Sequence, residues 1–576
     1  MHRRCWAGRA TLLMGATLLL AAAIAGCRTG KERPTSTSPG PERPAVEAPD
    51  AKPSRPETVG DVANQLQAAR LLHEPVPASG GVPILRQLVD EGWSVDEPLQ
   101  AEVKPLRSRV KRWRKIRCHE VRFTSHPWRE APVRIFGFYA LPAAAEDKLP
   151  GLLLVHGGGG YATLQRVVEA ASRGYAAFSI DLPGKGALRQ DRSRSTGPDM
   201  TVENIFTVKP ELSDNYLYNA VLAQVRSITF LRSRPEIDPE RIGMVGVSWG
   251  GASGLITTSL DKRIKCFVNM FGSGFLEGGS TWHSYFETLD AGEFDVWQAN
   301  FDAARYLASI DSPVLALTGS NDNCYYLPRF MKTHRAIEAT PALLLRPNLD
   351  HEIDQPARNA YFRWLDLQLK PDEAGAAPTL EAFRVSAAEG EVRVDVSTGG
   401  QVAVEKAEVC FGEVGEVGWT NRKWVTVSCR PDQARTCWAA QFALPSQTTY
   451  VFATVYFDDG AALSTPVHSV AMANINAEPL ALNMPFMEPD RMLVEAHVLA
   501  EAIRAQVAAR RDRSGVIITR GSSVADCDAR RLEGLYFVPL RDACRQLGGI
   551  VHFDKGVTTV SLAAVSKGAR PAQREP

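Results

Sequence analysis

The sequence predicts an α/β catalytic part built on a mostly parallel sheet, followed by an all-β sandwich and a small α+β module. Between residues 118 and 372, apolar segments of strand length alternate with helical segments, which is typical of a parallel sheet covered on both faces. Across residues 378–475 the helical pattern is replaced by short alternating strands separated by turn residues. In residues 485–563 a weak strand–helix–strand pattern occurs twice. A chain of 576 residues therefore holds several domains.

The expected strands of the catalytic part are short apolar runs, several of them rich in β-branched or aromatic residues. They are Val121–Thr124, Val133–Leu141, Leu149–His156, Ala176–Asp181, Arg241–Val247, Ile264–Met270, Val314–Thr318 and Leu343–Arg346. The helices expected between or after them are Gln165–Arg173, Tyr216–Arg232 and Ala357–Leu369. This alternation predicts strand–helix–strand units with parallel neighbours.

The N-terminus carries an export signal rather than part of the fold. A basic start is followed by the apolar run Ala10–Ala25, so residues 1–26 are expected to be a signal peptide. The segment Ile24-Ala25-Gly26-Cys27 resembles the lipobox of bacterial lipoproteins, which implies lipidation of Cys27. We therefore expect a protein anchored by its lipid to a membrane of the bacterial cell envelope, facing outside the cytoplasm. The alternative is an ordinary signal peptide in which Cys27 is incidental.

Composition describes the segments around the folded parts. Residues 27–59 are rich in Pro, Ser and Thr and are expected to be a disordered tether, residues 60–117 to be partly helical, and residues 564–576 to be a disordered tail. Basic residues crowd into Lys104–Arg117, either as a contact for anionic lipid or polysaccharide or as a solvated helix face, which we favour. The formal net charge of +1 gives no electrostatic case for a nucleic-acid partner.

The cysteines point to no metal centre. Their spacing is irregular and contains no CxxC pair, so neither a zinc site nor another metal or cofactor is expected. Export permits disulfides, and the pairs closest in sequence are Cys429 with Cys437 and Cys527 with Cys544. Spacing alone does not fix the pairing.

The strongest functional signal is Gly246-Val247-Ser248-Trp249-Gly250, which lies between an expected strand and an expected helix. In that context the pattern is a nucleophile elbow, a strained turn that exposes a serine hydroxyl at the end of a parallel strand. The turn requires small residues two positions before and two positions after the serine, and both are glycine. The following helix N-terminus favours developing negative charge. The sequence therefore predicts the α/β-hydrolase fold with Ser248 as nucleophile.

An oxyanion loop is predicted at His156-Gly157-Gly158-Gly159-Gly160, directly after an earlier expected strand. Glycines there let backbone N–H groups face the nucleophile. We expect the N–H groups of Trp249, Gly159 and Gly160 to form the oxyanion hole, and His156 to be structural. A phosphate-binding loop is excluded because the required Gly-Lys-Ser/Thr sequence is missing.

The remaining catalytic residues follow the last two expected strands. Asp322 comes after Val314–Thr318, and His351 comes after Leu343–Arg346. The order Ser, Asp, His along the chain is that of an α/β-hydrolase triad. His351 would take the serine proton, and Asp322 would fix its tautomer and stabilise the imidazolium.

Other acids and histidines compete for these roles. Asp350 and Asp354 flank the histidine, but side chains that close in sequence rarely point at the imidazole ring. His283 and His334 are expected to be surface residues.

Three further segments carry a family resemblance: Asp181–Gly186, Pro235–Ile242 and Gly319–Asp322. With the elbow, they resemble α/β-hydrolases of the acetyl xylan esterase, prolyl oligopeptidase and dienelactone hydrolase-like group over about residues 120–370. The resemblance implies acyl transfer to the serine followed by hydrolysis. The chain departs from prolyl peptidases because no seven-bladed propeller precedes the catalytic part; only about 60 ordered residues are available there, against four strands per blade.

We therefore expect an exported carboxylic ester hydrolase whose substrate is a small acyl ester or an acetylated carbohydrate. The alternatives are a serine peptidase of the same fold and a non-catalytic adhesion protein with a relict hydrolase domain, although an intact triad argues against a relict. A group of aromatic and histidine side chains either lines a substrate pocket or, for most members, belongs to the core: Trp282, His283, Tyr285, Phe286 and Trp297.

The C-terminal module has a resemblance of its own. Tyr536–Arg541, with Leu547-Gly548-Gly549 and His552-Phe553-Asp554, resembles the copper amine oxidase N-terminal-like domain. The resemblance implies a stalk or an attachment to a cell-envelope polymer, and no copper chemistry. Because residues 378–475 and 485–563 contain no nucleophile–base pair, we expect them to be dispensable for turnover of a small ester.

Overall fold

A computed structural model describes the ordered parts of the chain. The described ranges are 82–90, 97–106, 115–185, 194–276, 280–286, 288–339, 341–388, 391–413, 419–443 and 448–471, with strand segments between 486 and 562. The predicted signal peptide, Cys27, the tether and the tail lie outside these ranges. Within them, no helix has the length and apolar character needed to cross a bilayer.

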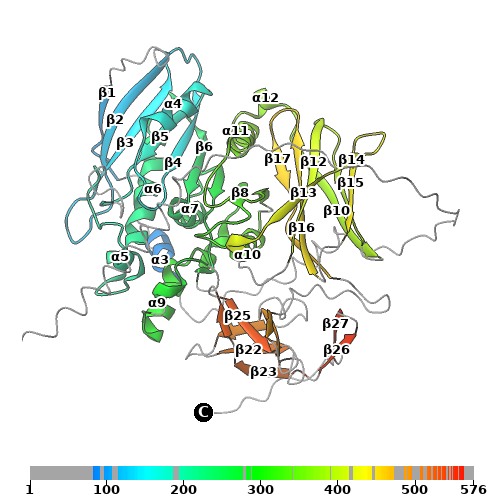
Figure 1. Cartoon of the computed structure of the whole chain (residues 1–576). Helices are drawn as coiled ribbons and strands as arrows, with labels where there is room; N and C mark the ends of the chain where they lie inside the picture. Colours follow the sequence, from blue (N-terminus) through cyan, green and yellow to red (C-terminus); the bar gives the residue numbers. More distant parts are fainter. Residues whose placement is uncertain are drawn as a thin grey trace, which may run out of the picture.

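A nine-stranded sheet forms the catalytic part, in the order β1-β2-β3-β5-β4-β6-β7-β8-β9 (Figure 1). Its strands are β1 (Glu102–Leu106), β2 (Ile116–Thr124), β3 (Arg134–Pro142), β4 (Leu149–Val155), β5 (Ala176–Ile180), β6 (Ile237–Val247), β7 (Cys266–Met270), β8 (Val314–Gly319) and β9 (Ala342–Arg346). Neighbours from β5 to β9 are parallel, whereas β1, β2 and β3 pair in antiparallel fashion. The predicted fold class, an α/β-hydrolase with a mostly parallel sheet, is confirmed.

Helices cover both faces of this sheet. They include α4 (Leu164–Ser172), α6 (Tyr216–Arg232), α7 (Trp249–Leu260), α10 (Leu327–Arg335) and α11 (Gln355–Leu369). A Cβ added at Gly243 of β6 would meet Leu369 of α11, whereas the next side chain, Met244, lies against α7. Adjacent strand residues point to opposite faces, so α7 and α11 lie on opposite sides of the sheet. The sheet interior is therefore shielded from water, as the continuous apolar strands require.

The N-terminal edge differs from the sequence prediction. The prediction placed residues 60–117 in a separate, partly helical segment. In the structure α3 (Ile84–Asp90) is a helix, but β1 pairs with β2 and belongs to the main sheet. Leu85 and Leu99 are buried in the catalytic core. The catalytic unit therefore begins before residue 118, and short strands with mixed polarity such as β1 escape a pattern-based assignment.

A β-sandwich follows the catalytic part. One sheet has the order β10-β11-β15-β14, and the other has β13-β12-β16-β17 with β18 paired to β16. The strands are β10 (Leu380–Ala388), β11 (Glu391–Thr398), β12 (Val404–Glu413), β13 (Trp424–Ser428), β14 (Arg430–Pro431), β15 (Cys437–Ala443), β16 (Thr448–Phe457), β17 (Ala462–Ser464) and β18 (His468–Ala471). Alternating buried valines of β11, Val392, Val394 and Val396, form part of its core.

Two cysteines of the sandwich, Cys429 and Cys437, were suggested as a disulfide pair from their spacing. Cys429 and Cys437 are not bonded to each other. Cys437 lies on β15 opposite Ser397 of β11, whereas the backbone of Cys429 bonds to Ala407 of β12 in the other sheet. Proximity in sequence was a poor guide because Cys429 lies in the link between β13 and β14, whereas Cys437 begins β15. Cys544 of the second suggested pair lies outside the described residues.

The sandwich packs directly against the catalytic part beside β8, β9 and α10 (Figure 1). Both sides contribute to one apolar cluster, which includes Ala316, Leu327, Phe330, Met331, Leu343 and Leu345 from the catalytic part and Cys410, Trp419, Trp424, Tyr450 and Phe452 from the sandwich. Arg363 of α11 also forms an ion pair with Asp459, at 2.7 Å. Removing the sandwich would expose this cluster to water, which argues against the expectation that the sandwich is dispensable.

The C-terminal region contributes further antiparallel strands. They are β19 (Phe486–Glu488), β20 (Arg491–Glu495), β21 (Gln506–Ala509), β22 (Gly515–Arg520), β23 (Ser523–Asp528), β24 (Arg530–Leu532), β25 (Leu535–Pro539), β26 (Gly549–Asp554) and β27 (Val557–Leu562). They form the sheets β19-β20-β25-β24, β21-β22-β23 and β26-β27. Residues 506–509 form the strand β21, although a helix was expected between the two strands of the first predicted strand–helix–strand unit.

Candidate active site

The nucleophile elbow is formed where β6 ends and α7 begins. Ser248 adopts φ +58° and ψ −122°, a strained conformation for a non-glycine residue, and its backbone N–H donates to the Met270 carbonyl at 2.8 Å. A Cβ at Gly246 would lie 2.2 Å from the carbonyl oxygen of Gly250, and a Cβ at Gly250 would lie 2.4 Å from that of His156. Both glycines are therefore required sterically. Ser248 is 9% exposed at the N-terminus of the helix.

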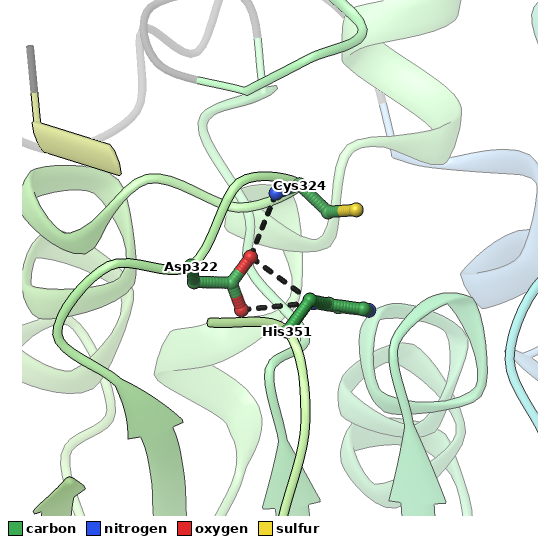
Figure 2. A group of neighbouring side chains, drawn as sticks. All are labelled: Asp322, Cys324 and His351. Atoms are coloured by element: carbon green, nitrogen blue, oxygen red, sulfur yellow. Dashed lines mark hydrogen bonds and ion pairs between the residues drawn. The ribbon is translucent and has the colours of Figure 1, made fainter. Parts of the chain in front are cut away.

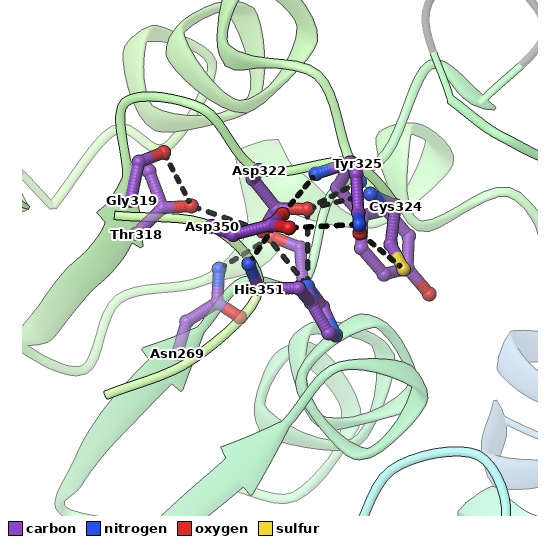
Figure 3. Close-up of polar contacts among 10 residues, drawn as sticks. Asn269, Thr318, Gly319, Asp322, Cys324, Tyr325, Asp350 and His351 are labelled. Carbon is purple, nitrogen blue, oxygen red and sulfur yellow. Dashed lines mark hydrogen bonds and ion pairs between the residues drawn. The ribbon is translucent and has the colours of Figure 1, made fainter. Parts of the chain in front are cut away.

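The acid and the histidine are hydrogen-bonded to each other (Figure 2). Nδ1 of His351 lies 3.0 Å and 2.9 Å from the two carboxylate oxygens of Asp322. The carboxylate also accepts hydrogen bonds from the backbone N–H groups of Cys324 and Tyr325 and from the hydroxyl of Thr318 (Figure 3). Asp322 is 1% exposed, and both of its carboxylate oxygens accept hydrogen bonds. Its charge therefore fixes a proton on Nδ1 and leaves Nε2 to act as a base.

The competing acids are engaged elsewhere. Asp350 accepts from the backbone N–H of His351 at 2.7 Å and from both nitrogens of Asn323. Asp354 caps α11 and forms an ion pair with Arg346 at 2.8 Å. Neither carboxylate bonds to the imidazole.

The other two histidines, His283 and His334, were both expected at the surface. His334, expected at the surface, is instead buried in α10, with Nε2 3.0 Å from the Pro341 carbonyl, and burial lowers its pKa to about 4. Its helix faces the sheet and the sandwich, which the sequence around it did not reveal. The side chain of His283 lies outside the described residues.

The surroundings of His351 shift the pKa of its imidazole. Burial lowers the pKa of His351, but the charge and hydrogen bond of Asp322, together with the charge of Asp350, outweigh it, so the pKa is raised above its ordinary value. The ring packs on Phe271, with ring centroids 4.7 Å apart, and Phe271 directly follows the residue that binds the Ser248 backbone. The elbow and the acid–histidine pair are thus held by adjacent parts of the same sheet edge.

The glycine-rich loop lies against Ser248, but the glycines nearest to it are not the ones that were expected. A Cβ at Gly157 would lie 2.6 Å from Cβ of Ser248, and a Cβ at Gly158 would lie 3.2 Å from the Trp249 ring. The N–H of Gly160 donates to the Gly157 carbonyl at 3.1 Å. Gly160 is therefore not a free donor, which corrects the prediction for that residue. The expectation failed because a run of four glycines does not reveal which peptide faces the serine.

His156 organises this loop. Its Nδ1 lies 2.8 Å from the Gly157 carbonyl, and its Nε2 accepts from the backbone N–H of Leu182 at 3.0 Å. Burial lowers the pKa of His156 to about 4, so the ring is neutral at neutral pH. The Gly157 carbonyl is thus held by His156 and Gly160 on one side. Because the peptide is planar and trans, the N–H of Gly158 points to the other side.

Aromatic side chains pack around the nucleophile. Ring centroids of Trp249 and Trp282 are 5.1 Å apart, and the ring of Tyr325 lies 6.0 Å from both Trp249 and His351. The predicted aromatic group is split between roles: Phe286 and Trp297 are core residues with 0% exposure, whereas Trp282 also contacts the site.

The sequence analysis missed Tyr325, which the structure places beside the nucleophile. Its hydroxyl is fully buried, as are the indole nitrogens of Trp249 and Trp282. Burial raises the pKa of Tyr325 well above its ordinary value, with Cys324 and Asp322 acting in the same direction and nearby Trp282 and Ser248 in the opposite one. The phenol therefore stays protonated. Its position three residues after the acid was the available signal.

Within the described residues, the site also contains a group with metal-ligand chemistry. Ligand atoms of Asp322, Cys324 and His351 all lie within 4.8 Å of one another (Figure 2). The carboxylate of Asp322 is already satisfied by His351, Thr318 and two backbone N–H groups. This saturation fits an acid–base pair, and the geometry calls for no further ligand.

The chain is similar to known esterases. A family model described as Acetyl xylan esterase (AXE1) matches residues 94–276, a range that includes Ser248 and the oxyanion loop and ends before Asp322. An acetyl esterase from Xylanibacter ruminicola, Axe7A, is 24% identical over 250 residues, which cover 41% of this chain and 56% of that protein. Together with the site, these similarities support an enzyme of the serine carboxylic ester hydrolase class.

The chain is also similar to peptidases and to solved esterase structures. Dipeptidyl-peptidase 5 from Porphyromonas endodontalis is 29% identical over 159 residues, or 24% of this chain and 23% of that protein. The solved acetyl xylan esterase from Paenibacillus sp. R4 has a TM-score of 0.44 and 20% identity, covering 53% of this chain and 99% of that one. The chain thus spans little more than half of the first curated relative and about a quarter of the second.

Proposed function

We propose that this protein hydrolyses short acyl esters, with acetyl groups on carbohydrate as the preferred substrate class. The observation that carries the proposal is the hydrogen-bonded pair of Asp322 and His351 at the sheet edge where Ser248 occupies its strained elbow. The match to an acetyl xylan esterase family model supports the substrate class.

The proposed mechanism uses an acyl-enzyme. Nε2 of His351 takes the proton of the Ser248 hydroxyl as Oγ attacks the acyl carbon, and the resulting imidazolium is stabilised by Asp322. When the tetrahedral intermediate collapses, the bond to the leaving oxygen breaks and His351 gives its proton to the departing alcohol. A water molecule then attacks the acyl-enzyme by the same route and releases the carboxylic acid.

The oxyanion hole is proposed to consist of the N–H groups of Trp249 and Gly158. The N–H of Trp249 lies at the first turn of α7, where helix donors have no intrahelical acceptor. The N–H of Gly158 points away from the carbonyl that His156 and Gly160 hold, in a loop whose Gly157 lies against Ser248. Gly159, with φ +67°, serves in this proposal as the turn residue that lets the loop close.

The hydroxyl of Tyr325 is proposed to donate to the tetrahedral intermediate, because it is a buried, protonated donor beside Ser248. We expect Tyr325→Phe to lower kcat about 10-fold or more with KM changed less than about twofold, since a hydrogen bond to a charged group contributes about 1.5–3 kcal/mol. Steady-state kinetics on a nitrophenyl acetate measures this.

The matched control is Tyr285→Phe, which also removes a phenol hydroxyl from an aromatic side chain that packs on Trp282. Tyr285 is not placed next to Ser248. Tyr285 contacts Trp282 and Phe206. Its variant should retain kcat within about twofold. A wild-type kcat in Tyr325→Phe would remove Tyr325 from the mechanism.

A serine peptidase is the second candidate, favoured by the similarity to a dipeptidyl-peptidase. The triad cannot separate the two reactions, but access can, because a peptide must be held in register and its amine protonated as it leaves.

We expect kcat/KM for an acetyl ester to exceed that for any proline-containing peptide amide by at least about 100-fold, or about 2.7 kcal/mol. Parallel kinetics on acetylated sugars, nitrophenyl esters and proline peptides decides the matter, and equal or faster peptide cleavage would reverse the ranking.

The proposed setting is the outer face of a membrane in the bacterial cell envelope. It is supported by the predicted export signal and by the lipobox-like segment that ends at Cys27. The resemblance of the C-terminal module to stalk-like domains fits attachment to an envelope polymer. Fractionation of whole cells tests this location.

A further inference from the structure

A loop of the β-sandwich reaches the catalytic loop that carries Asp322. The loop is the segment Trp419–Trp424, and two of its backbone carbonyls accept hydrogen bonds from the side chain of Asn321. Nδ2 of Asn321 lies 3.1 Å from the Thr420 carbonyl oxygen and 2.6 Å from that of Arg422. Asn321 directly precedes the catalytic acid, so the sandwich is bonded to the residue adjacent to it.

The same segment is bonded to the loop that carries His351. Nδ2 of Asn348 donates to the Trp424 carbonyl at 2.7 Å, and Oδ1 of Asn348 accepts from the Trp424 N–H at 2.8 Å. This reciprocal pair satisfies both backbone groups of one sandwich residue. Asn348 adopts φ +56°, a conformation that asparagine tolerates better than most residues. The loop geometry and the interdomain contact thus depend on the same side chain.

A buried serine connects the two catalytic loops. The hydroxyl of Ser320, which is 0% exposed, donates to Oδ1 of Asn321 at 2.7 Å and accepts from the backbone N–H of Asn348 at 2.8 Å. The backbone N–H of Asn321 donates to the Leu349 carbonyl at 3.0 Å. The contacts form one continuous network from the sandwich through both loops. A network in which every member is satisfied restricts side-chain and backbone position.

Apolar packing lies beside this network on the sandwich side, whereas Asn348 itself is exposed. Trp419 and Trp424 belong to the apolar cluster shared with α10 and β9. Leu345 of β9 also donates its N–H to the hydroxyl of Ser464 in β17, at 2.9 Å. Because β9 leads directly into the loop of Asn348 and His351, the sandwich holds both the strand and its exit loop.

We propose that the β-sandwich is part of the catalytic unit and that its Trp419–Trp424 segment positions Asp322 and His351 through Asn321 and Asn348. The two asparagines are positioning residues, because neither contacts the imidazole or the carboxylate directly. The inference rests on the proposed function for the roles of Asp322 and His351. A displacement of about 1 Å in such a pair can lower the rate by about 100-fold.

The test uses two neutral substitutions in the full chain, Asn321→Ala and Asn348→Gly. Alanine removes the donor to the two sandwich carbonyls, and glycine removes the reciprocal contact while accommodating the positive φ of position 348. Neither adds charge near His351. We expect each variant to lower kcat on a short ester about 10-fold, with KM within about twofold, after active-site titration with a fluorophosphonate. Titration counts competent enzyme, so partial unfolding does not imitate the effect.

Asp459→Asn is the matched control. It breaks the ion pair with Arg363 in the same interface without touching either catalytic loop, and should leave kcat within about twofold. Hydrogen exchange gives a readout that does not depend on activity: amides of residues 319–326 and 347–352 should exchange faster in the asparagine variants, and those of β4 should not change.

The outcomes separate the two proposals. A wild-type protein that neither hydrolyses esters nor reacts with fluorophosphonate would overturn the proposed function, while exchange would still test the contact. An active wild type whose Asn321→Ala and Asn348→Gly variants keep wild-type kcat and exchange would overturn the positioning role. The two variants test that role separately, so failure of one to fold leaves the other decisive.

Discussion

Replacing Ser248 with alanine is expected to lower kcat for a short acyl ester by at least about four orders of magnitude. The substitution removes the atom that forms the acyl-enzyme and leaves only substrate binding and the oxyanion hole, which in such enzymes retain about 10³–10⁴-fold over the uncatalysed rate. The backbone conformation, φ +58°, is as demanding for alanine as for serine, so stability should change little. Steady-state kinetics and a thermal melt on the same preparation measure both effects.

Two further observations make the Ser248→Ala result specific. Fluorophosphonate should label the wild type at one serine and leave the variant unlabelled. Ser259→Ala, in the last turn of α7, removes a hydroxyl that donates within its own helix, to the Ile256 carbonyl at 2.7 Å. It should cost some stability and no catalytic rate. Hydrolysis by Ser248→Ala at even a tenth of the wild-type rate would contradict the assignment of the nucleophile.

The main sheet could be predicted because its signals are local. Each parallel strand is a short apolar run followed by polar or glycine residues, and the elbow has a steric requirement that only glycine meets at positions 246 and 250. Strand β1 was missed because it is an edge strand that pairs with β2 and has no fully buried residue. Its exposed residues alternate irregularly with half-buried ones, so no period identified it as a strand.

The order of residues along the chain was enough to propose the candidate acid and histidine, but the contacts that hold them in place could not be predicted. The acid and histidine follow the ends of successive strands, which places them at one edge of the sheet. The contacts of Asn321 and Asn348 with the sandwich join residues 76 to 101 positions apart. No period or spacing in one sequence encodes such a pairing. The same holds for the buried donor of Tyr325, which depends on how the loop after β8 folds back.

Asp322→Asn is the prediction that tests the acid most directly, and kcat is expected to fall about 10⁴-fold. The backbone N–H groups of Cys324 and Tyr325 both donate to Oδ1 of the carboxylate, so the oxygen of an asparagine must take that place. Its nitrogen then takes the place of Oδ2, which lies near the Thr318 hydroxyl and Nδ1 of His351. The nitrogen then faces Nδ1 of His351 and donates to it, which favours the tautomer with its proton on Nε2. That tautomer cannot accept the serine proton. Kinetics on a short ester measures the loss.

Asp350→Asn serves as the comparison, because that carboxylate also lies near the histidine but bonds its backbone rather than its ring. It should lower kcat by less than about 10-fold. The pH dependence adds a second criterion. His351 acts when neutral, so kcat/KM falls as the pH drops through its pKa, which Asp322 raises against the effect of burial. In Asp322→Asn burial remains and the raising charge is gone, so the acid limb of the residual activity should move to lower pH. An acid limb at unchanged pH would contradict the assignment of Asp322 as the acid of the triad. A larger loss of kcat in Asp350→Asn than in Asp322→Asn would contradict it as well.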